Sequence, residues 1–123
     1  MLSITLPGRI PSKKNSKQLI FRNNRTYFIP SENYTLWQQE QSWRLKKHVP
    51  KKPIERCKIE VTIYAPDKRK SDLSNKFESL ADLLVDNKIL ADDNWFMLYD
   101  ERITFGGVDA KNPRAIIEIT EVD

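Results

Sequence analysis

Residues 72–86 read DLSNKFESLADLLVD, and this stretch decides how the chain folds. Its large apolar side chains recur at spacings of four, three and four residues, at Leu73, Phe77, Leu80 and Leu84. That period is typical of an amphipathic helix. At about 100° per residue the apolar side chains gather on one face, and a second face collects Ser74, Asn75, Glu78 and Asp82. The sequence therefore predicts a helix that packs one side on a sheet and presents two carboxylates on another.

The segments before this helix predict strands. Residues 57–64 alternate between apolar and polar side chains, which is typical of a strand buried on one face. Their single cysteine, Cys57, is expected to be a small buried residue without a disulfide partner. An Asn-Asn pair at 23–24 separates two further strands, 17–22 and 25–29. Because asparagine tolerates positive φ, these two strands are expected to form a tight hairpin.

A second helix and three more strands complete the predicted elements. Ser31 is a good N-cap for a helix over residues 32–48, which contain no glycine or proline. The remaining strands are 2–7, 95–105 and 114–122, with the last two joined through the glycines at 106–107 and through Asn112-Pro113. This order predicts an α+β fold with a mixed or antiparallel sheet and two main helices. The length of 123 residues fits a single domain, 1–123.

Charge is distributed unevenly along the chain. The net charge is +4, but residues 72–101 hold eight acidic residues against Lys76 and Lys88, which gives −6 there and +10 elsewhere. A carboxylate pocket in a basic protein suits a metal-dependent enzyme that acts on a polyanion. A solvated acidic helix face without a site is the alternative. No apolar run approaches the roughly 20 residues of a membrane span, so we expect a cytoplasmic protein.

The candidate metal ligands lie at both ends of the acidic helix. Asp72 precedes it and would either cap the helix, by accepting from the backbone N–H of Ser74 or Asn75, or bind a metal ion. Asp92 and Asp93 follow the helix in a turn, where aspartates also serve as turn-forming residues. Hard divalent ions prefer several oxygen ligands, so carboxylates from a helix start and a returning loop are a workable set.

These motifs also carry a family resemblance. Residues 69–84 read RKSDLSNKFESLADLL, residues 89–95 read ILADDNW, and the chain opens with ITLP at 4–7 and PSKKN at 11–15. This combination resembles the RusA family of Holliday-junction resolvases, over most of the chain. The resemblance implies a homodimeric, Mg²⁺-dependent endonuclease, with Mn²⁺ as the alternative ion. Such an enzyme cuts paired strands at four-way DNA junctions in recombination and repair, and is typically encoded by phages and prophages.

Two positions depart from the family pattern. Ser74 stands where the family has a metal-binding aspartate, and Glu78 stands where it has a lysine. The two are i, i+4 neighbours on the helix, and helical side chains lean toward the N-terminus, so Glu78 points into the space that an aspartate at 74 would serve. We therefore expect Glu78 to supply the lost carboxylate. Lys76 lies on nearly the opposite side of the helix and cannot replace the missing lysine.

The expected site follows from the resemblance and from this compensation. The catalytic residues are Asp72, Glu78 and Asp93; the metal ligands are these three together with Asp82 and Asp92; and the residues that orient them are Ser74 and Asn75. The expected phosphate contacts are Lys13, Lys14, Lys17, Lys68, Arg69 and Lys70. The three tryptophans, Trp37, Trp43 and Trp95, are expected in the core or a dimer interface.

Two other functions remain open from the sequence. In the first, the acidic site has degenerated, and the chain is a noncatalytic phage DNA-binding or replication-accessory protein. In the second, it is a flap or branch nuclease with a broader range of substrates. Ser74 and Glu78 bear on the first alternative, because they decide whether the carboxylate set is rebuilt or lost.

Overall fold

Four strands form one mixed sheet in the computed structural model, which describes residues 1–12 and 17–122. The strands lie in the order β1-β6-β4-β5, with bounds β1 Leu2–Pro7, β6 Arg114–Glu121, β4 Cys57–Ala65 and β5 Leu98–Val108. Both β1 and β4 pair antiparallel with β6, whereas β4 and β5 are parallel. Two parallel strands need a crossover between them, and the acidic helix provides it. The predicted α+β class with a mixed sheet is confirmed.

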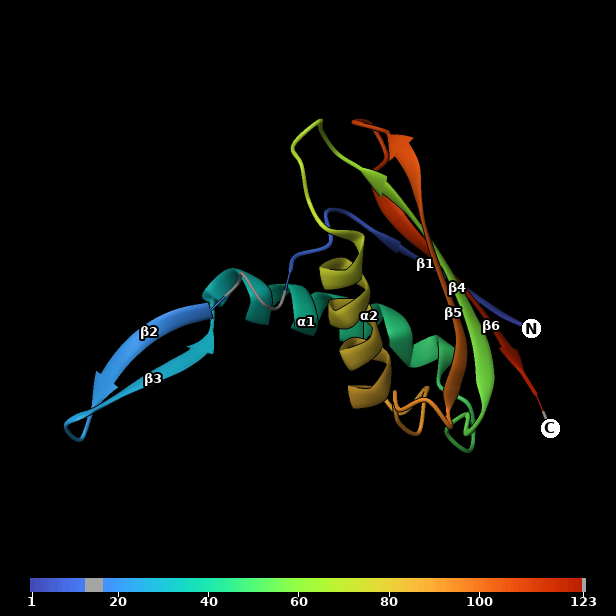
Figure 1. Ribbon diagram of the computed structural model, residues 1–123, viewed down its shortest axis with the longest axis horizontal. Helices are drawn as coiled ribbons and strands as arrows, with labels where there is room; N and C mark the ends of the chain where they lie inside the picture. Colours follow the sequence, from blue (N-terminus) through green and yellow to red (C-terminus); the bar gives the residue numbers. More distant parts are fainter. Residues whose placement is uncertain (13–16, 123) are drawn as a thin grey trace.

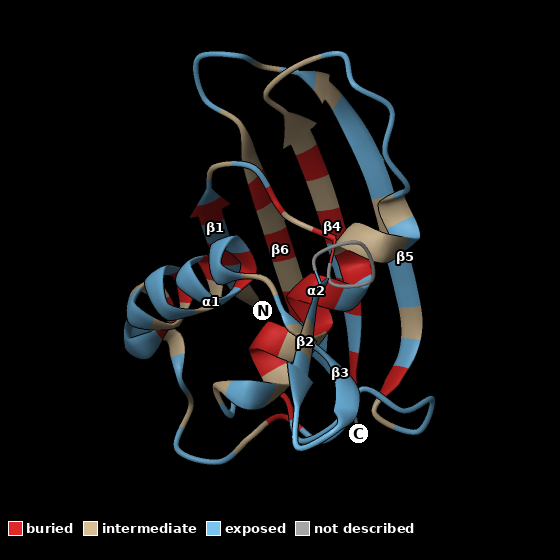
Figure 2. Ribbon diagram, turned by 90° about the vertical axis from the view of Figure 1, so that its left-hand side faces the viewer, coloured by how far each residue is buried: buried red, intermediate tan, exposed pale blue. Residues whose placement is uncertain are grey.

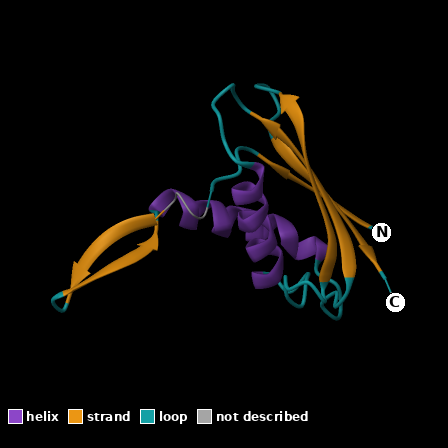
Figure 3. Cartoon of the chain, viewed as in Figure 1, coloured by secondary structure: helices purple, strands orange, loops and turns teal. Residues whose placement is uncertain are grey.

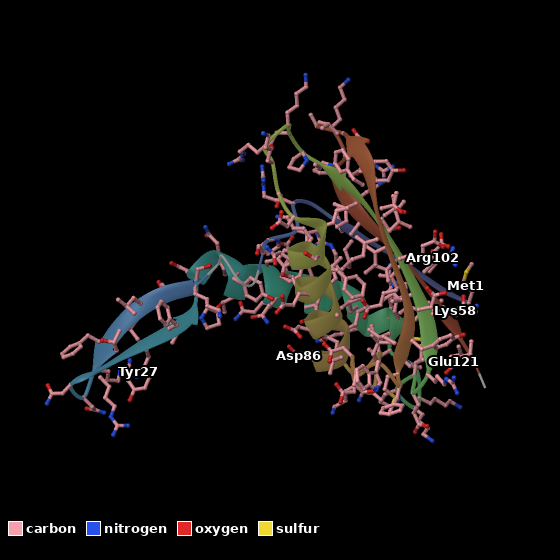
Figure 4. All side chains as sticks on the ribbon, in the orientation of Figure 1. Met1, Tyr27, Lys58, Asp86, Arg102 and Glu121 are labelled. Carbon is pink, nitrogen blue, oxygen red and sulfur yellow. The ribbon has the colours of Figure 1, made fainter. Side chains whose placement is uncertain are left out.

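Both helices cover the same face of the sheet (Figures 1 and 3). Helix α1 spans Glu32–Leu45 and continues as a single 3₁₀ turn, Lys46–His48, while α2 spans Leu73–Asp86. The predicted cap is present, because Ser31 Oγ accepts a hydrogen bond from the backbone N–H of Tyr34 at 3.2 Å. Among residues 1–12 and 17–122 no helix covers the opposite face of the sheet, where Lys58 and Arg102 lie (Figure 4). No helix of residues 1–12 and 17–122 has the length and apolar character needed to cross a membrane.

The hydrophobic core lies between the helices and the sheet. The predicted apolar face of α2 points into it, since Phe77, Leu80 and Leu84 are buried. They belong to the same core as buried residues of the central strands, such as Val61 and Ile117. Figure 2 shows these buried positions as red segments on α2, β4 and β6. Cys57 is also buried, as expected. Helix α2 is therefore held rigidly along one side, and its other faces remain available to carry charged groups.

The predicted hairpin is present and forms a separate two-stranded sheet. Strand β2, Lys17–Arg22, pairs antiparallel with β3, Arg25–Pro30, and the turn residues Asn23 and Asn24 have φ angles of 54° and 59°. Positive φ at both central residues is the geometry of a type I′ turn. The hairpin projects from the body of the molecule beyond one end of α1 (Figure 1).

Strand β5 differs from its prediction at both ends. It begins at Leu98 and runs to Val108, so Gly106 and Gly107 belong to the strand and the predicted connection there is wrong. Gly106 is the extra residue at a register shift, because Ile63 pairs with Phe105 while Tyr64 pairs with Gly107. A Cβ at Gly106 would lie 2.7 Å from the Tyr64 ring. Glycine is needed at this bulge because there is no room for a side chain.

Candidate active site

Four carboxylates from three parts of the chain form what we call the acidic cluster: Asp82 of α2, Asp92 and Asp93 of the following turn, and Glu101 of β5. The pKa of Asp93 is raised by burial, by its side-chain hydrogen bond to Asp92, and by the negative charges of Asp82 and Asp92. The pKa of Glu101 is raised by burial and then by the charge of Asp93. These mutual effects show that the carboxylates crowd one another.

Glu101 was not predicted as a site residue, because its orientation depends on a β-bulge. Cys57 pairs with Leu98 but Lys58 pairs with Asp100, so one extra residue, Tyr99, enters β5 at this point. The bulge reverses the alternation of the strand, and Glu101 therefore pairs with Ile59 on the helix-covered face. The only signal in the sequence was the position of Glu101 inside the acidic window 72–101.

Asp92 mainly organises the turn before β5. One of its carboxylate oxygens accepts from the backbone N–H of Asp93 at 2.7 Å, and the other accepts from Asn94 Nδ2 at 3.2 Å. Asn94 Oδ1 in turn accepts from the backbone N–H groups of Phe96 and Met97. Asp92 was expected to be either a metal ligand or a turn-forming residue, and this network supports the second role. It also fixes the backbone that carries Asp93.

Asp72 occupies the N-cap position of α2 but does not cap it through its side chain. The expected hydrogen bond from the backbone is absent, and the carboxylate instead accepts from Asn75 Nδ2 at 3.3 Å. Asn75 thus contacts the carboxylate of Asp72, and its role in orienting a metal ligand stays a prediction. Since Asp72 makes no capping bond, its exposed carboxylate is available to a ligand.

Asp72 is the N-cap of α2, whereas Asp82 of the acidic cluster lies in the last turns of this helix. Ten residues separate Asp72 from Asp82, which is about 15 Å along a helix at 1.5 Å per residue. Metal–oxygen bonds are only about 2.0–2.6 Å long. A single ion therefore cannot bind both Asp72 and the acidic cluster of one chain. Glu78 is exposed one helical turn before Asp82, and Ser74 is exposed one turn before Glu78.

A groove of about 500 Å³ lies at the Asp72 end of α2. Its lining includes the basic loop at 68–70, Asp72 and Phe105. Arg69 is held in place, because its Nε and Nη2 donate to Asp67 at 3.1 and 3.0 Å. These hydrogen bonds from Arg69 lower the pKa of Asp67 to about 2, and Arg9 also donates to the same carboxylate. A fixed guanidinium beside two exposed lysines, Lys68 and Lys70, suits a phosphate group.

The remaining candidate lysines lie on α2, at the start of the hairpin, or outside the described residues. Lys76 is half-buried, and its ammonium donates to the carbonyl oxygen of Ile10 in the segment after β1. Lys17 is exposed at the start of the hairpin. Lys13 and Lys14 lie outside the described residues.

The tryptophans divide between the core and the surface. Trp37 is buried, as expected for a core residue. Trp43 and Trp95 have exposed fractions of 70% and 79%, so a place in the core of this chain is wrong for both. The dimer-interface alternative for these two side chains stays a prediction.

The carboxylates fit Mg²⁺ by their chemistry. The acidic cluster offers only oxygen donors, and a cation between its members would relieve the repulsion that raises the pKa of Asp93. Among residues 1–12 and 17–122, no three His, Cys, Asp or Glu side chains converge on one point as a ready metal site. Mg²⁺ needs no such cage, because it usually takes one or two carboxylates and completes its shell with water and substrate phosphate.

Comparison with known proteins agrees with the resemblance in the sequence. No curated protein matches the chain. The model of the endodeoxyribonuclease RusA family matches residues 7–120. That range includes the hairpin, the basic loop, α2 and the whole acidic cluster. Because the match covers nearly the whole chain, the chain belongs to the RusA family of endodeoxyribonucleases.

Proposed function

We propose that this chain, as a single domain over residues 1–123, is a metal-dependent endonuclease that hydrolyses phosphodiester bonds in four-way DNA junctions. Membership of an endodeoxyribonuclease family is the observation that carries the proposal. Two features of the chain support it. Carboxylates crowd together at one end of α2, and a groove lined by a basic loop lies at the other end. Nuclease chemistry needs both a metal-binding group and cations for the DNA backbone.

Asp93 and Asp82 would hold Mg²⁺ or Mn²⁺, with Glu101 beside them. When bound, the ion supplies Lewis-acid activation of water and neutralises charge on the phosphate. Asp92 positions Asp93 through its hydrogen bond to the backbone of that residue. Glu101 lies near Asp93 on the neighbouring strand β5 and is suited to orient a water molecule.

Asp72 and Glu78 have separate roles in this proposal. Asp72 shares its groove with Lys68 and Lys70, where its carboxylate would hold a second ion beside a bound phosphate. Glu78 lies between the two ends of α2 and replaces the carboxylate that Ser74 lacks. Two cuts in opposite strands require two active sites, so we propose a homodimer, whose second protomer would supply the second site.

Cleavage of synthetic DNA tests the proposal directly. A four-way junction and a linear duplex of the same sequence are incubated with the protein in Mg²⁺, in Mn²⁺ and in EDTA. We expect cleavage of the junction only with metal, and Asp93→Asn should abolish cleavage while junction binding remains. An inactive wild-type protein that binds the junction would refute the proposal in favour of the noncatalytic alternative. Cleavage of flaps and other branches at equal rates would favour the broader nuclease.

A matched pair of variants tests the arrangement of β5. Glu101→Gln removes a carboxylate from the acidic cluster, whereas Asp100→Asn changes the adjacent residue, which faces the opposite side of the sheet. We expect Glu101→Gln to lower the cleavage rate at least about tenfold, because it removes a group that aids proton transfer. Asp100→Asn should leave the rate within about twofold. Equal effects would contradict the assignment of Glu101. Glu78→Gln tests the compensation separately, because an active Glu78→Gln variant would refute it.

A further inference from the structure

The β2–β3 hairpin exposes large apolar side chains on one of its faces. Leu19 pairs directly with Phe28, and Phe21 lies two residues along the same strand, so all three share this face. Their exposed fractions are 60%, 73% and 73% for Leu19, Phe21 and Phe28. Tyr27 lies on the opposite face, far from the sheet residues Lys58 and Glu121 (Figure 4). An isolated two-stranded hairpin is only marginally stable in water, so this arm is suited to a partner.

The charge of the hairpin indicates the chemistry of that partner. Residues 17–30 contain Lys17, Arg22 and Arg25 and no acidic residue. Arg22 and Arg25 are directly opposite each other in the last pair before the turn. Like charges in this position destabilise a hairpin, and an anion between them would offset the repulsion. The tight turn at Asn23-Asn24 holds both arginines at the tip.

These observations fit DNA. A two-stranded ribbon is narrow enough to enter the major groove of a duplex, and six residues per strand extend about 20 Å. Apolar side chains such as phenylalanine and leucine insert between base steps, and aromatic rings stack on unpaired bases. Bases at a branch point are less completely stacked than those in a duplex, so they are the least costly to separate.

We propose that the β2–β3 hairpin is a DNA-binding arm that enters the branch point of the substrate. Leu19, Phe21 and Phe28 contact unstacked bases from one face of the hairpin. Arg22 and Arg25 at the tip lie on the face of Tyr27 and bind phosphates there. This inference rests on the proposed function, because the branch point belongs to that substrate. A second copy of the chain is the other occupant that an apolar face would accept, but three cations without an acid favour a polyanion over an identical, equally basic hairpin.

Binding in EDTA tests the arm without any dependence on cleavage. The probe is a four-way junction that carries 2-aminopurine beside the branch point, and the fluorescence of this base rises when it is unstacked. We expect the wild-type protein to raise the fluorescence and the double variant Phe21→Ser/Phe28→Ser to abolish most of that rise. The same variant should weaken binding at least about fivefold, the lower limit for loss of one stacked base. Leu36→Ser is the control, because Leu36 is a similarly exposed apolar residue on α1.

A second pair of variants examines the charged tip. Arg22→Gln/Arg25→Gln should reduce the slope of log K against log salt by about 2, since each phosphate contact contributes about 0.9. Arg102→Gln, an exposed arginine on the helix-free face of the sheet, should leave the slope unchanged. Circular dichroism should show unchanged melting for all variants, because the exposed residues replaced lie outside the core.

Two results would refute the proposal that the hairpin is a DNA-binding arm. The first is wild-type binding and fluorescence in the Phe21→Ser/Phe28→Ser variant. The second is conversion of a wild-type dimer into a monomer by the same substitutions without DNA, which would assign the face to a second copy. Failure of the proposed function looks different. A wild-type protein that unstacks the branch-point base but cleaves nothing in Mg²⁺ refutes the nuclease proposal and supports the DNA-binding role of the hairpin.

Discussion

Gly106→Ala should destabilise the protein through a steric conflict with Tyr64. The new Cβ would lie 2.7 Å from Cε1 and Cζ of the Tyr64 ring and 3.0 Å from Cγ2 of Thr62. Non-bonded carbon atoms prefer about 3.5–4.0 Å, so the ring must move by about 1 Å. The Arg114 guanidinium lies over this ring, 3.9 Å from its centroid, and the movement would disturb that contact as well.

The expected magnitude follows from two opposing effects. Overpacking costs about 1–3 kcal/mol, whereas replacing glycine by alanine lowers the entropy of the unfolded chain and stabilises by about 0.4–1 kcal/mol. The net loss in the free energy of unfolding should be about 1–2 kcal/mol. At about 2.1 cal/mol/K per residue, a chain of 123 residues has an unfolding entropy of about 0.26 kcal/mol/K. The melting temperature should therefore fall by about 4–8 °C.

A double-mutant cycle in urea separates this clash from other effects. Tyr64→Ala removes the ring, so Gly106→Ala made in that background should be neutral or slightly stabilising. The difference between the two backgrounds is the coupling free energy of the pair, and we expect it to be at least about 1 kcal/mol. An equal loss of stability in both backgrounds would refute the reasoning, because the clash could not then involve the Tyr64 ring.

Three further predictions concern other parts of the chain. Burial raises the pKa of Cys57 from 9.0 to about 11, so at pH 8 its thiolate fraction is about one in a thousand. Iodoacetamide should therefore label the native protein at least about 100-fold more slowly than the urea-unfolded protein. Equal labelling rates would contradict this prediction. Because Arg69 lowers the pKa of Asp67 from 3.8 to about 2, the stability from this ion pair should be present above pH 4 and lost as the pH falls toward 2. Urea midpoints of Asp67→Asn should lack that part of the acid dependence, and identical pH profiles for both proteins would speak against it. Leu84→Ala, at a fully buried position of α2, should cost about 2–5 kcal/mol in the free energy of unfolding, while Leu36→Ala on the surface should cost less than about 0.5 kcal/mol.

Local patterns in the sequence determined most of the elements. The spacing of Phe77, Leu80 and Leu84 was sufficient to predict α2 and its buried face, because a helix repeats about every 3.6 residues. Ser31 as a cap and the Asn-Asn turn of the hairpin were also correct, since caps and tight turns depend on side chains only a few residues apart. The family was identified for a similar reason, because its motifs are short and contiguous.

The arrangement of the site depended on contacts between distant segments. Nothing near Glu101 in the chain indicates that Tyr99 forms a bulge, because the bulge arises from pairing with β4, about 40 residues earlier. Asp72 and Asp93 belong to one motif in sequence, yet the length of α2 separates them in space. The sequence by itself determined which carboxylates the chain carries, through local periodicity and motif. Only the tertiary structure decided which of them meet, because strand register and helix length set the distances between side chains.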